Sequence, residues 1–240
     1  MRTRSIDGEI GFYTGSIQTA AIVMRRACGR SSTLMRCMFQ IVSMTPPTGS
    51  SNVIIVTLRS DQGGLTEVSR MKTAYLVTGE PGIGKTTLIR QVVSTMHMRA
   101  AGFYTEDLRM RGAREGFRIV TLDGDIGLLA SAGHPGPAQV SKYGVDLEEL
   151  ERIGVAAIRR AMERGHVVVA DEIGRMQLFS RPFRQTMFEA VREGHPMLGT
   201  VMLGRNPYAD KIKAHRNVEV LTLTEDTRND ILAYLRTKFV

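Results

Sequence analysis

A glycine-rich segment of the chain has the residue types and the spacing that bind a triphosphate. It reads Gly79, Glu80, Pro81, Gly82, Ile83, Gly84, Lys85, Thr86 and Thr87, which matches the pattern G-x-x-x-x-G-K-[ST] in full. The glycines allow the backbone to wrap closely around a phosphate with its N–H groups pointing inward. Lys85 would then face the β- and γ-phosphates, Thr86 would offer its hydroxyl to Mg²⁺, and Thr87 would reach the α-phosphate.

The residues on either side of this segment place it between a strand and a helix. Residues 73–78 form a short apolar run typical of a strand, and a helical pattern extends from Lys85 to about Met98. A phosphate held here would face the positive end of that helix. An incidental glycine turn is the alternative, but phosphate binding requires this strand–turn–helix context and the sequence supplies it.

A second pattern supplies carboxylates. An apolar strand over residues 167–170 is followed directly by Asp171 and Glu172, as in a Walker B motif. Asp171 would bind Mg²⁺ together with Thr86, and Glu172 would polarise the attacking water. The alternative is that both acids mark only the exit of the strand into solvent. The second acid favours hydrolysis, because kinases of small metabolites usually lack it and carry an arginine-rich lid instead.

Further candidates are single residues. Thr200 lies in a predicted strand and would contact the γ-phosphate or the water, unless it only packs in that strand. Several arginines could neutralise charge in the transition state, and Arg175 is the best placed because it follows Glu172 closely. The full set of arginine candidates is Arg109, Arg111, Arg118, Arg175, Arg205 and Arg228.

The elements that must position these residues alternate along the chain after residue 70. Strands are predicted at residues 73–78, 102–109, 116–122, 126–130, 166–170, 196–203 and 218–222. Helices are predicted at 85–98, 146–165, 181–194 and 224–238, with a loop at 131–144. Strands that alternate with helices predict a three-layer α/β/α domain with a mainly parallel sheet.

Composition excludes some classes of protein and leaves others open. The chain has 240 residues, a net charge of +8 and two cysteines, so it is not a disulfide scaffold. No apolar run approaches the roughly 18 residues that a membrane helix needs, and no membrane partner is expected. The sequence pI near 9.9 raises the question of a nucleic-acid partner.

Much of the positive charge lies in residues 1–70, which contain eight arginines, no lysine and four acidic residues. Residues 45–51 resemble a linker, and residues 52–58 are predicted to form an isolated strand. The segment is interpreted as a targeting peptide, as an arm that binds polyanions, or as sequence upstream of the true start at Met71. We favour the last, an N-terminal extension that is disordered or misassigned, which weakens the case for nucleic acid.

The working domain, residues 71–240, resembles a family of small nucleoside-triphosphatases of archaea and bacteria. This family has a human relative called cancer-related nucleoside-triphosphatase. The likeness is carried by the glycine-rich segment and by residues 102–106, 116–124, 142–145 and 171–179. Gly-Phe-Tyr-Thr at 102–105 together with Asp-Glu-Ile-Gly at 171–174 is far more specific than the glycine-rich segment alone.

The resemblance implies a RecA-like P-loop domain that hydrolyses several nucleoside triphosphates to the diphosphate and phosphate, slowly, with Mg²⁺ and little base selectivity. Arg175 stands where the family often has Lys and keeps the charge. Gln177 stands where the family often has Glu, so the charge of that acid is absent here.

The sequence therefore predicts a cytoplasmic, Mg²⁺-dependent nucleoside-triphosphatase. Lys85 and Glu172 are its expected catalytic residues, and Thr86 and Asp171 are expected to hold the metal. Two alternatives stay open at this stage. One is a nucleotide or polynucleotide kinase, and the other is a switch ATPase that acts on a nucleic-acid or protein partner.

Overall fold

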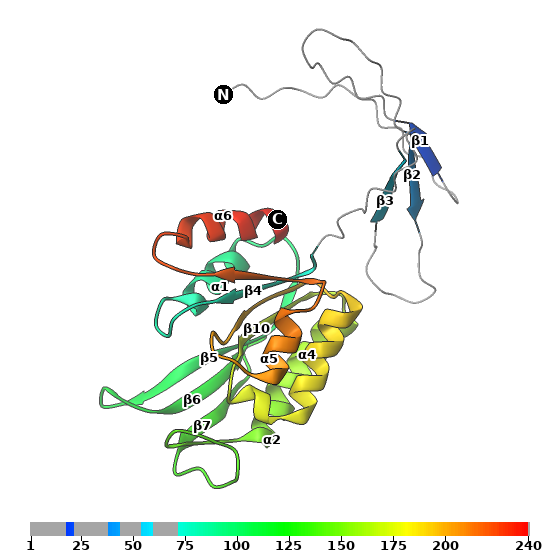
Figure 1. Cartoon of the computed structure of the whole chain (residues 1–240). Coiled ribbons are helices and arrows are strands. Elements are labelled where there is room, and N and C mark those ends of the chain that lie inside the picture. The colour runs from blue at the N-terminus through cyan, green and yellow to red at the C-terminus, as the bar shows by residue number, and fades with distance from the viewer. Residues whose placement is uncertain (1–17, 22–37, 44–53, 60–71, 240) are drawn as a thin grey trace. The chain divides into compact units, whose positions relative to one another are not determined.

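The computed structural model describes residues 18–21, 38–43, 54–59 and 72–239, and the chain divides into two compact units, Met1–Arg70 and Met71–Val240. In the first unit β1 (Gln18–Ala21), β2 (Met38–Ser43) and β3 (Ile54–Arg59) form an antiparallel sheet in that order (Figure 1). The strand predicted as isolated at 52–58 corresponds to β3, and it pairs with β2. The linker predicted at 45–51 lies outside the described residues, as does most of the predicted extension 1–70.

The second unit is built on a nine-stranded sheet with parallel strands on one side and antiparallel strands on the other. The parallel strands, in spatial order, are β12 (Val218–Thr222), β4 (Ala74–Thr78), β11 (Met197–Val201), β10 (Val167–Ile173) and β5 (Ala100–Met110). The sheet continues through β6 (Ala113–Thr121), β7 (Ile126–Ala132), β9 (Tyr143–Val145) and β8 (Gln139–Val140), all antiparallel. The predicted parallel centre is confirmed.

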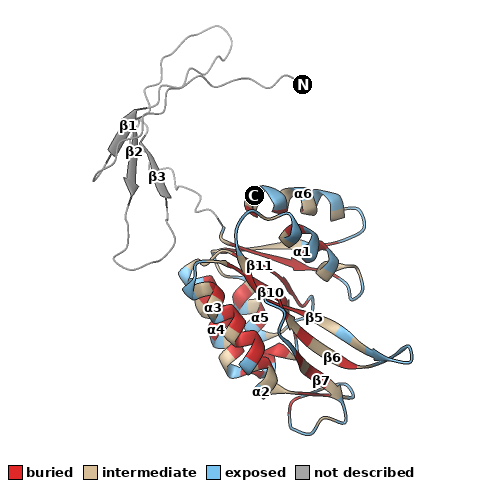
Figure 2. Cartoon of the chain, turned by 180° about the vertical axis from the view of Figure 1, so that it is seen from behind, coloured by how far each residue is buried: buried red, intermediate tan, exposed pale blue. Residues whose placement is uncertain are grey.

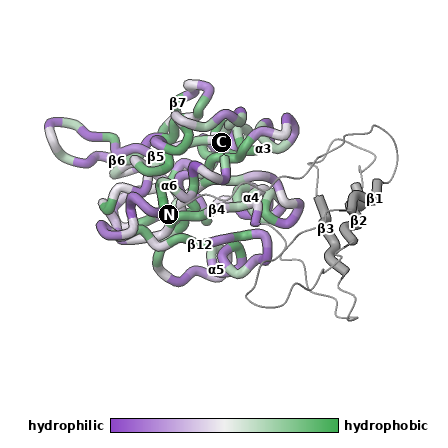
Figure 3. Tube along the Cα trace, turned by 90° about the horizontal axis from the view of Figure 1, so that it is seen from above, coloured by the Kyte–Doolittle hydropathy of each residue, from purple (hydrophilic) through white to green (hydrophobic). Residues whose placement is uncertain are grey.

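The antiparallel side begins at a tight turn. β5 and β6 are joined at Arg111 and Gly112, whose φ angles are 49° and 83°. A two-residue connection can join only antiparallel strands, because a parallel pair needs a crossover of a dozen or more residues. The resulting hairpin projects from the domain, and its far end is hydrophilic (Figures 1 and 3).

Helices cover both faces of the sheet (Figure 2). On one face α1 (Lys85–Ser94) contacts α6 (Arg228–Phe239). The other face carries α3 (Ala156–Glu163), α4 (Arg181–Glu193) and α5 (Pro207–Lys213). Successive side chains of β10 point to opposite faces of the sheet. Val167 and Val169 belong to the core beneath α1 and α6, and Val168 and Ala170 belong to the core beneath α3 and α4. A strand buried on both faces explains the continuous apolar run in the sequence, and the three-layer prediction is confirmed.

Several helix ends lie at or beside the predicted boundaries and are held by capping residues. The Asp146 carboxylate accepts a hydrogen bond from the Glu149 N–H at 2.9 Å, and the Ser180 hydroxyl accepts one from Phe183 N–H at 3.0 Å. Gly194 ends α4 with a φ of 79°. The helix that follows Asp146 is not uniform. It begins as α2 (Leu147–Glu149), continues as a wider π-helical segment, η1 (Leu150–Val155), and ends as α3.

Other local predictions need correction. The loop predicted at 131–144 contains β8 and the start of β9, and α5 was not predicted. α5 begins where Asn206 Oδ1 accepts hydrogen bonds from the N–H groups of Tyr208 and Ala209. The last helix begins at Arg228 rather than at Thr224, which instead holds a preceding turn. β8 and α5 are short, so periodicity gives little signal for them. No helix in the described part of the chain has the length and hydropathy to cross a membrane.

Candidate active site

The glycine-rich segment forms the loop between β4 and α1, as predicted. Gly79, Gly82 and Gly84 have φ angles of 155°, 82° and 89°, which residues with side chains rarely adopt. A Cβ at Gly79 would lie 2.7 Å from the carbonyl oxygen of Leu223. The close turn thus depends on glycine both for its backbone angles and for the room beside β12.

Lys85 opens α1 and its ammonium group turns back into this loop. Nζ donates hydrogen bonds to the carbonyl oxygens of Gly79 at 2.9 Å and Glu80 at 3.0 Å. The charge therefore lies inside the curve of the backbone, beside the start of a helix. A phosphate entering the loop would meet both the ammonium group and the free N–H groups of the first helical turn.

Asp171 and Thr200 meet at the carboxyl ends of two neighbouring strands. β11 lies between β4 and β10, so Thr200 near its end lies beside both predicted motifs. The Thr200 hydroxyl donates a hydrogen bond to Asp171 Oδ1. Thr200 is fully buried and Asp171 is 3% exposed, yet Asp171 Oδ2 has no hydrogen-bond partner among the described residues.

Burial raises the pKa of both acids. Desolvation raises the pKa of Asp171, while the hydrogen bond from Thr200, the nearby Thr86 hydroxyl and the charge of Lys85 act in the opposite direction. Desolvation also raises the pKa of Glu172, and the neighbouring Asp171 raises it further, against the opposing charge of Lys85. The buried Asp171 and the half-buried Glu172 therefore favour a positive charge near them.

The arrangement fits a magnesium ion. Asp171 Oδ2 is buried and has no hydrogen-bond partner among the described residues. The Asp171 carboxylate also lies near the Thr86 hydroxyl, and oxygen is the ligand that Mg²⁺ prefers. No cluster of three or more His, Cys, Asp or Glu side chains occurs in residues 72–239. A magnesium ion that arrives with a nucleotide needs only one or two protein ligands, since phosphates and waters supply the rest.

A cavity of about 700 Å³ brings the two motifs together. Its walls include Lys85, Thr86, Asp171, Glu172 and Arg175. Glu80, Pro81 and the three loop glycines Gly79, Gly82 and Gly84 also line it. Three predicted site residues, Ile83, Thr87 and Thr200, lie outside the lining, although Thr200 reaches it through Asp171.

The structure separates the arginine candidates. Arg118 pairs with Glu106 and Arg109 pairs with Asp107 on the hairpin, so these charges are already compensated. Arg228 donates to the carbonyl oxygen of Ile83 and packs against Gly84, outside the cavity lining. Arg175 lines the cavity and has no acidic partner in residues 72–239. Arg205 is exposed and lines a neighbouring pocket, and Arg111 lies at the hairpin tip.

The hairpin contributes a wall of the cavity that motif analysis missed. Thr105, Glu106, Asp107, Arg114 and Phe117 all line it. The Gln177 amide, also in the lining and only 2% exposed, donates a hydrogen bond to the Thr105 hydroxyl at 3.2 Å. The segments at 102–106 and 116–124 were noted only for their resemblance, because nothing local in them indicates that β5 and β6 reach the loop.

Gly174 belongs to the segment 171–174 that carries the resemblance, but the motifs assign it no role. A Cβ built there would lie 2.2 Å from Glu172 Oε1 and 2.9 Å from its Cγ. The Glu172 side chain therefore occupies the space above Gly174. Because Gly174 has no side chain, the Glu172 carboxylate can occupy this position.

Comparison with known proteins shows the family of this chain. A protein-family model described as NTPase matches residues 74–235. The chain belongs to this NTPase family. It is 42% identical over 157 residues to nucleoside-triphosphatase THEP1 of Thermotoga sp. strain RQ2, covering 65% of this chain and 90% of that protein. It is 38% identical over 182 residues to human cancer-related nucleoside-triphosphatase, covering 68% of this chain and 94% of the human protein.

Solved structures of NTPase-family members have the same fold. The crystal structure of THEP1 from Aquifex aeolicus has a TM-score of 0.63 and 31% identity, and covers 69% of this chain and 98% of that one. The solution structure of the human cancer-related enzyme has a TM-score of 0.58 and 34% identity, with 69% and 96% covered. The expected family, P-loop fold and nucleoside-triphosphatase class are thus confirmed.

Proposed function

We propose that this chain hydrolyses nucleoside triphosphates to the diphosphate and phosphate with the Walker residues of the cavity as its catalytic groups. The observation that supports this most strongly is that Lys85, Asp171 and Glu172 line one cavity, although more than 80 residues separate Lys85 from the two acids. The relatives are named nucleoside-triphosphatases, which favours hydrolysis over the kinase and switch alternatives.

In this proposal the loop and Lys85 hold the β- and γ-phosphates, with the Lys85 ammonium exchanging its carbonyl partners for phosphate oxygens. Thr86 and Asp171 Oδ2 hold Mg²⁺, which would supply positive charge to the phosphate oxygens. Glu172 orients a water for attack on the γ-phosphorus and accepts its proton. The bond from the γ-phosphorus to the bridging oxygen breaks, and the diphosphate leaves with that oxygen.

Arg175 is proposed to stabilise the charge that spreads over the γ-phosphoryl oxygens during this step. It lines the cavity and no acidic side chain in residues 72–239 neutralises it. Thr200 is proposed to act through Asp171 rather than by touching the nucleotide, since its hydroxyl is already bonded to that carboxylate. Because cells keep nucleoside triphosphates inside, a cytoplasmic location follows from the proposal. A nucleic-acid partner has only the weak support of the sequence pI.

The test is phosphate release from ATP, GTP, CTP and UTP by the full chain, with and without Mg²⁺. We expect turnover of all four in Mg²⁺ and none in excess chelator. Lys85→Ala should lower turnover at least about 100-fold, because it removes the charge that faces the phosphates. Lys72→Ala is the matched control, since the Lys72 ammonium donates to the Arg216 carbonyl oxygen and lies outside the cavity lining. Transfer of the γ-phosphate to an added nucleoside or RNA end, with little free phosphate, would contradict the proposal.

A further inference from the structure

Arg228, the first residue of α6, lies against the glycine-rich loop from outside the catalytic cavity. Its Nη2 donates a hydrogen bond to the carbonyl oxygen of Ile83, 145 residues earlier in the chain. A Cβ built on Gly84 would lie 3.1 Å from Arg228 Nη1 and 3.2 Å from Nη2. The guanidinium group therefore fills the space that the missing side chain of Gly84 leaves.

Threonine hydrogen bonds hold the turn that precedes α6. The Thr224 N–H donates to Thr227 Oγ1 at 2.9 Å, and the Thr227 N–H donates to Thr224 Oγ1 at 3.2 Å. The Thr227 hydroxyl also donates to the carbonyl oxygen of Thr222 at 3.0 Å. β12, which leads into this turn, pairs with β4, which leads into the glycine-rich loop. The turn thus fixes Arg228 beside the loop.

The peptide group that Arg228 contacts also has a donor on its other side. The Ile83 carbonyl and the Gly84 N–H belong to one trans peptide group, so they point in opposite directions. The carbonyl faces Arg228, which lies outside the cavity lining, whereas Gly84 lines the cavity. The Gly84 N–H has no hydrogen-bond partner among the described residues. It is therefore a donor that faces away from Arg228 and is available to a phosphate.

The charge of Arg228 can act on a phosphate through this peptide group. A charged donor at a carbonyl oxygen polarises the peptide, which strengthens the hydrogen bond that its N–H group gives. No carboxylate in residues 72–239 lies within ion-pair distance of Arg228, so no ion pair cancels its charge. Arg228 thus differs from Arg175, which lines the cavity itself.

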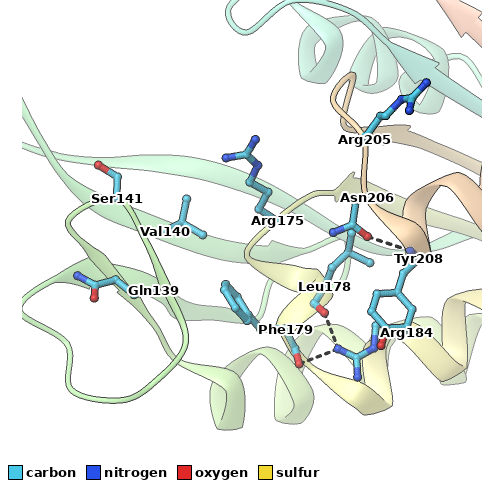
Figure 4. A pocket seen from close by; sticks show the side chains of 10 residues that line it. All are labelled: Gln139, Val140, Ser141, Arg175, Leu178, Phe179, Arg184, Arg205, Asn206 and Tyr208. Carbon is cyan, nitrogen blue, oxygen red and sulfur yellow. Dashed lines mark hydrogen bonds between the residues drawn. The ribbon is translucent and has the colours of Figure 1, made fainter.

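Arg184 makes a similar contact away from the loop, in a neighbouring pocket of about 500 Å³ (Figure 4). Its Nη1 donates to the carbonyl oxygens of Leu178 at 2.7 Å and Phe179 at 3.1 Å. The N–H groups of those two peptides, on Phe179 and Ser180, already donate to carbonyl oxygens of the same turn. Arg184 therefore stabilises a closed turn, whereas the peptide held by Arg228 keeps the Gly84 N–H for a ligand.

We propose that Arg228 is a positioning residue, which holds the Ile83–Gly84 peptide so that the Gly84 N–H donates to the β-phosphate of the nucleotide. The inference rests on the phosphate-binding part of the proposed function and adds a residue that does not touch the nucleotide. The loop N–H groups hold a phosphate that diphosphates, triphosphates and pyrophosphate all offer. Arg228 should therefore contribute to the affinity for all three, and neither to the choice of base nor to the chemical step.

The test is calorimetric titration of ADP, a non-hydrolysable ATP analogue and pyrophosphate, each with Mg²⁺, into the full chain and its Arg228→Met variant. Methionine keeps an apolar stem but removes the charge and the donors. We expect the affinity for all three ligands to fall about tenfold, by similar factors. In turnover assays KM should rise while kcat stays within about threefold of wild type. Arg228→Lys keeps a charged donor and should bind within about threefold of wild type.

Two variants serve as controls. Arg184→Met removes the similar arginine–carbonyl contact, and Arg236→Met removes an exposed arginine from the last turn of α6. Both should keep wild-type affinities, although Arg184→Met should lower the melting temperature as Arg228→Met does.

Unchanged affinity in Arg228→Met, an equal loss in Arg184→Met, or a loss that spares pyrophosphate would each overturn the inference. A wild-type chain that binds none of the three ligands would refute the phosphate site and the inference with it. Binding of all three without hydrolysis of ATP would instead contradict only the proposed function.

Discussion

The hydroxyl of Thr200 donates a hydrogen bond to Oδ1 of Asp171, joining the carboxyl ends of β11 and β10. One oxygen of the carboxylate is thereby held by the protein, while Oδ2 has no partner and is buried. A carboxylate held in this way presents a single oriented oxygen to a cation. The proposed metal site thus depends on a residue of a third strand as well as on the two motifs.

Replacing Thr200 by valine should therefore weaken the use of magnesium. Valine keeps the shape of the side chain but removes the donor, which leaves a buried acceptor unsatisfied at a cost of about 1–3 kcal/mol. We expect the Mg²⁺ concentration for half-maximal turnover to rise about fivefold or more and kcat to fall. A magnesium titration of phosphate release measures both. Thr200→Ser restores the hydroxyl and should recover most of the activity, and wild-type magnesium dependence in Thr200→Val would exclude this role.

Glu172→Gln should separate binding from turnover. Glutamine has nearly the same shape but cannot accept the proton of the attacking water, so kcat should fall about 100-fold or more. Affinity for a nucleoside triphosphate, measured by equilibrium titration, should stay within about threefold of wild type. Glu148→Gln, at an exposed position of α2, is the control. Full turnover by Glu172→Gln would refute the assignment of Glu172.

Gly174→Ala should displace the same carboxylate without touching its chemistry. The added Cβ would lie 2.2 Å from Glu172 Oε1, and the flexible Glu172 side chain would move aside rather than the backbone. We expect kcat to fall about tenfold or more, with stability changed by less than about 0.5 kcal/mol. Gly204 lines the same cavity, but a Cβ there would meet only Met202 Cε at 3.6 Å. Gly204→Ala should therefore keep its activity, and equal losses in both variants would exclude this explanation.

Without Mg²⁺ and nucleotide, Asp171→Asn should be more stable than the wild-type protein at neutral pH, because it removes the buried charge of Asp171. The two proteins should have similar stability in acid. Burial raises the pKa of Asp171, so the folded state keeps its proton to a higher pH than the unfolded state. Stability from this group is therefore lost as pH rises from the unfolded pKa, about 3.9, through the raised folded pKa. Asparagine mimics the protonated form and avoids this loss.

Denaturant unfolding of both proteins, without Mg²⁺ or nucleotide, measures the difference. Asp171→Asn should exceed wild type by about 1–3 kcal/mol at pH 7.5, the cost of an unsatisfied buried group, and the gap should close toward pH 4. Acids whose pKa is lowered by arginine partners, such as Glu106 and Asp107, shift stability in the opposite direction but equally in both proteins. A gap that does not change with pH would contradict the prediction.

Much of the fold could be predicted because its signals are local. Each of these signals depends only on residues that are close in the sequence. Examples are the apolar runs at β4 and β10, the capping residues Asp146 and Ser180, and Gly194 at the end of α4. Such signals fail where an element is short. α5 has 7 residues and β8 has 2, so neither contains enough turns or alternations to show a period.

The candidate site divides in the same way. Lys85, Thr86, Asp171 and Glu172 could be named from motifs, because a phosphate loop and a strand that ends in acids have fixed spacing in sequence. The role of Thr200 in orienting Asp171 could not be predicted, since a threonine in a strand is usually a packing residue. Its bond to Asp171 exists because β11 lies next to β10, and strand order is a property of long-range packing.

Motifs and periodicity lie in consecutive residues, so they were enough to predict the reaction class, the family and the positions of the main helices and strands. Which arginines remain free depends instead on tertiary packing, since ion pairs such as Arg118 with Glu106 form across the β5–β6 hairpin. Tertiary packing also decided that Arg205 lines a second pocket, which shares Arg175 with the catalytic cavity. Those outcomes depend on how elements distant in sequence pack together, and no local pattern records that.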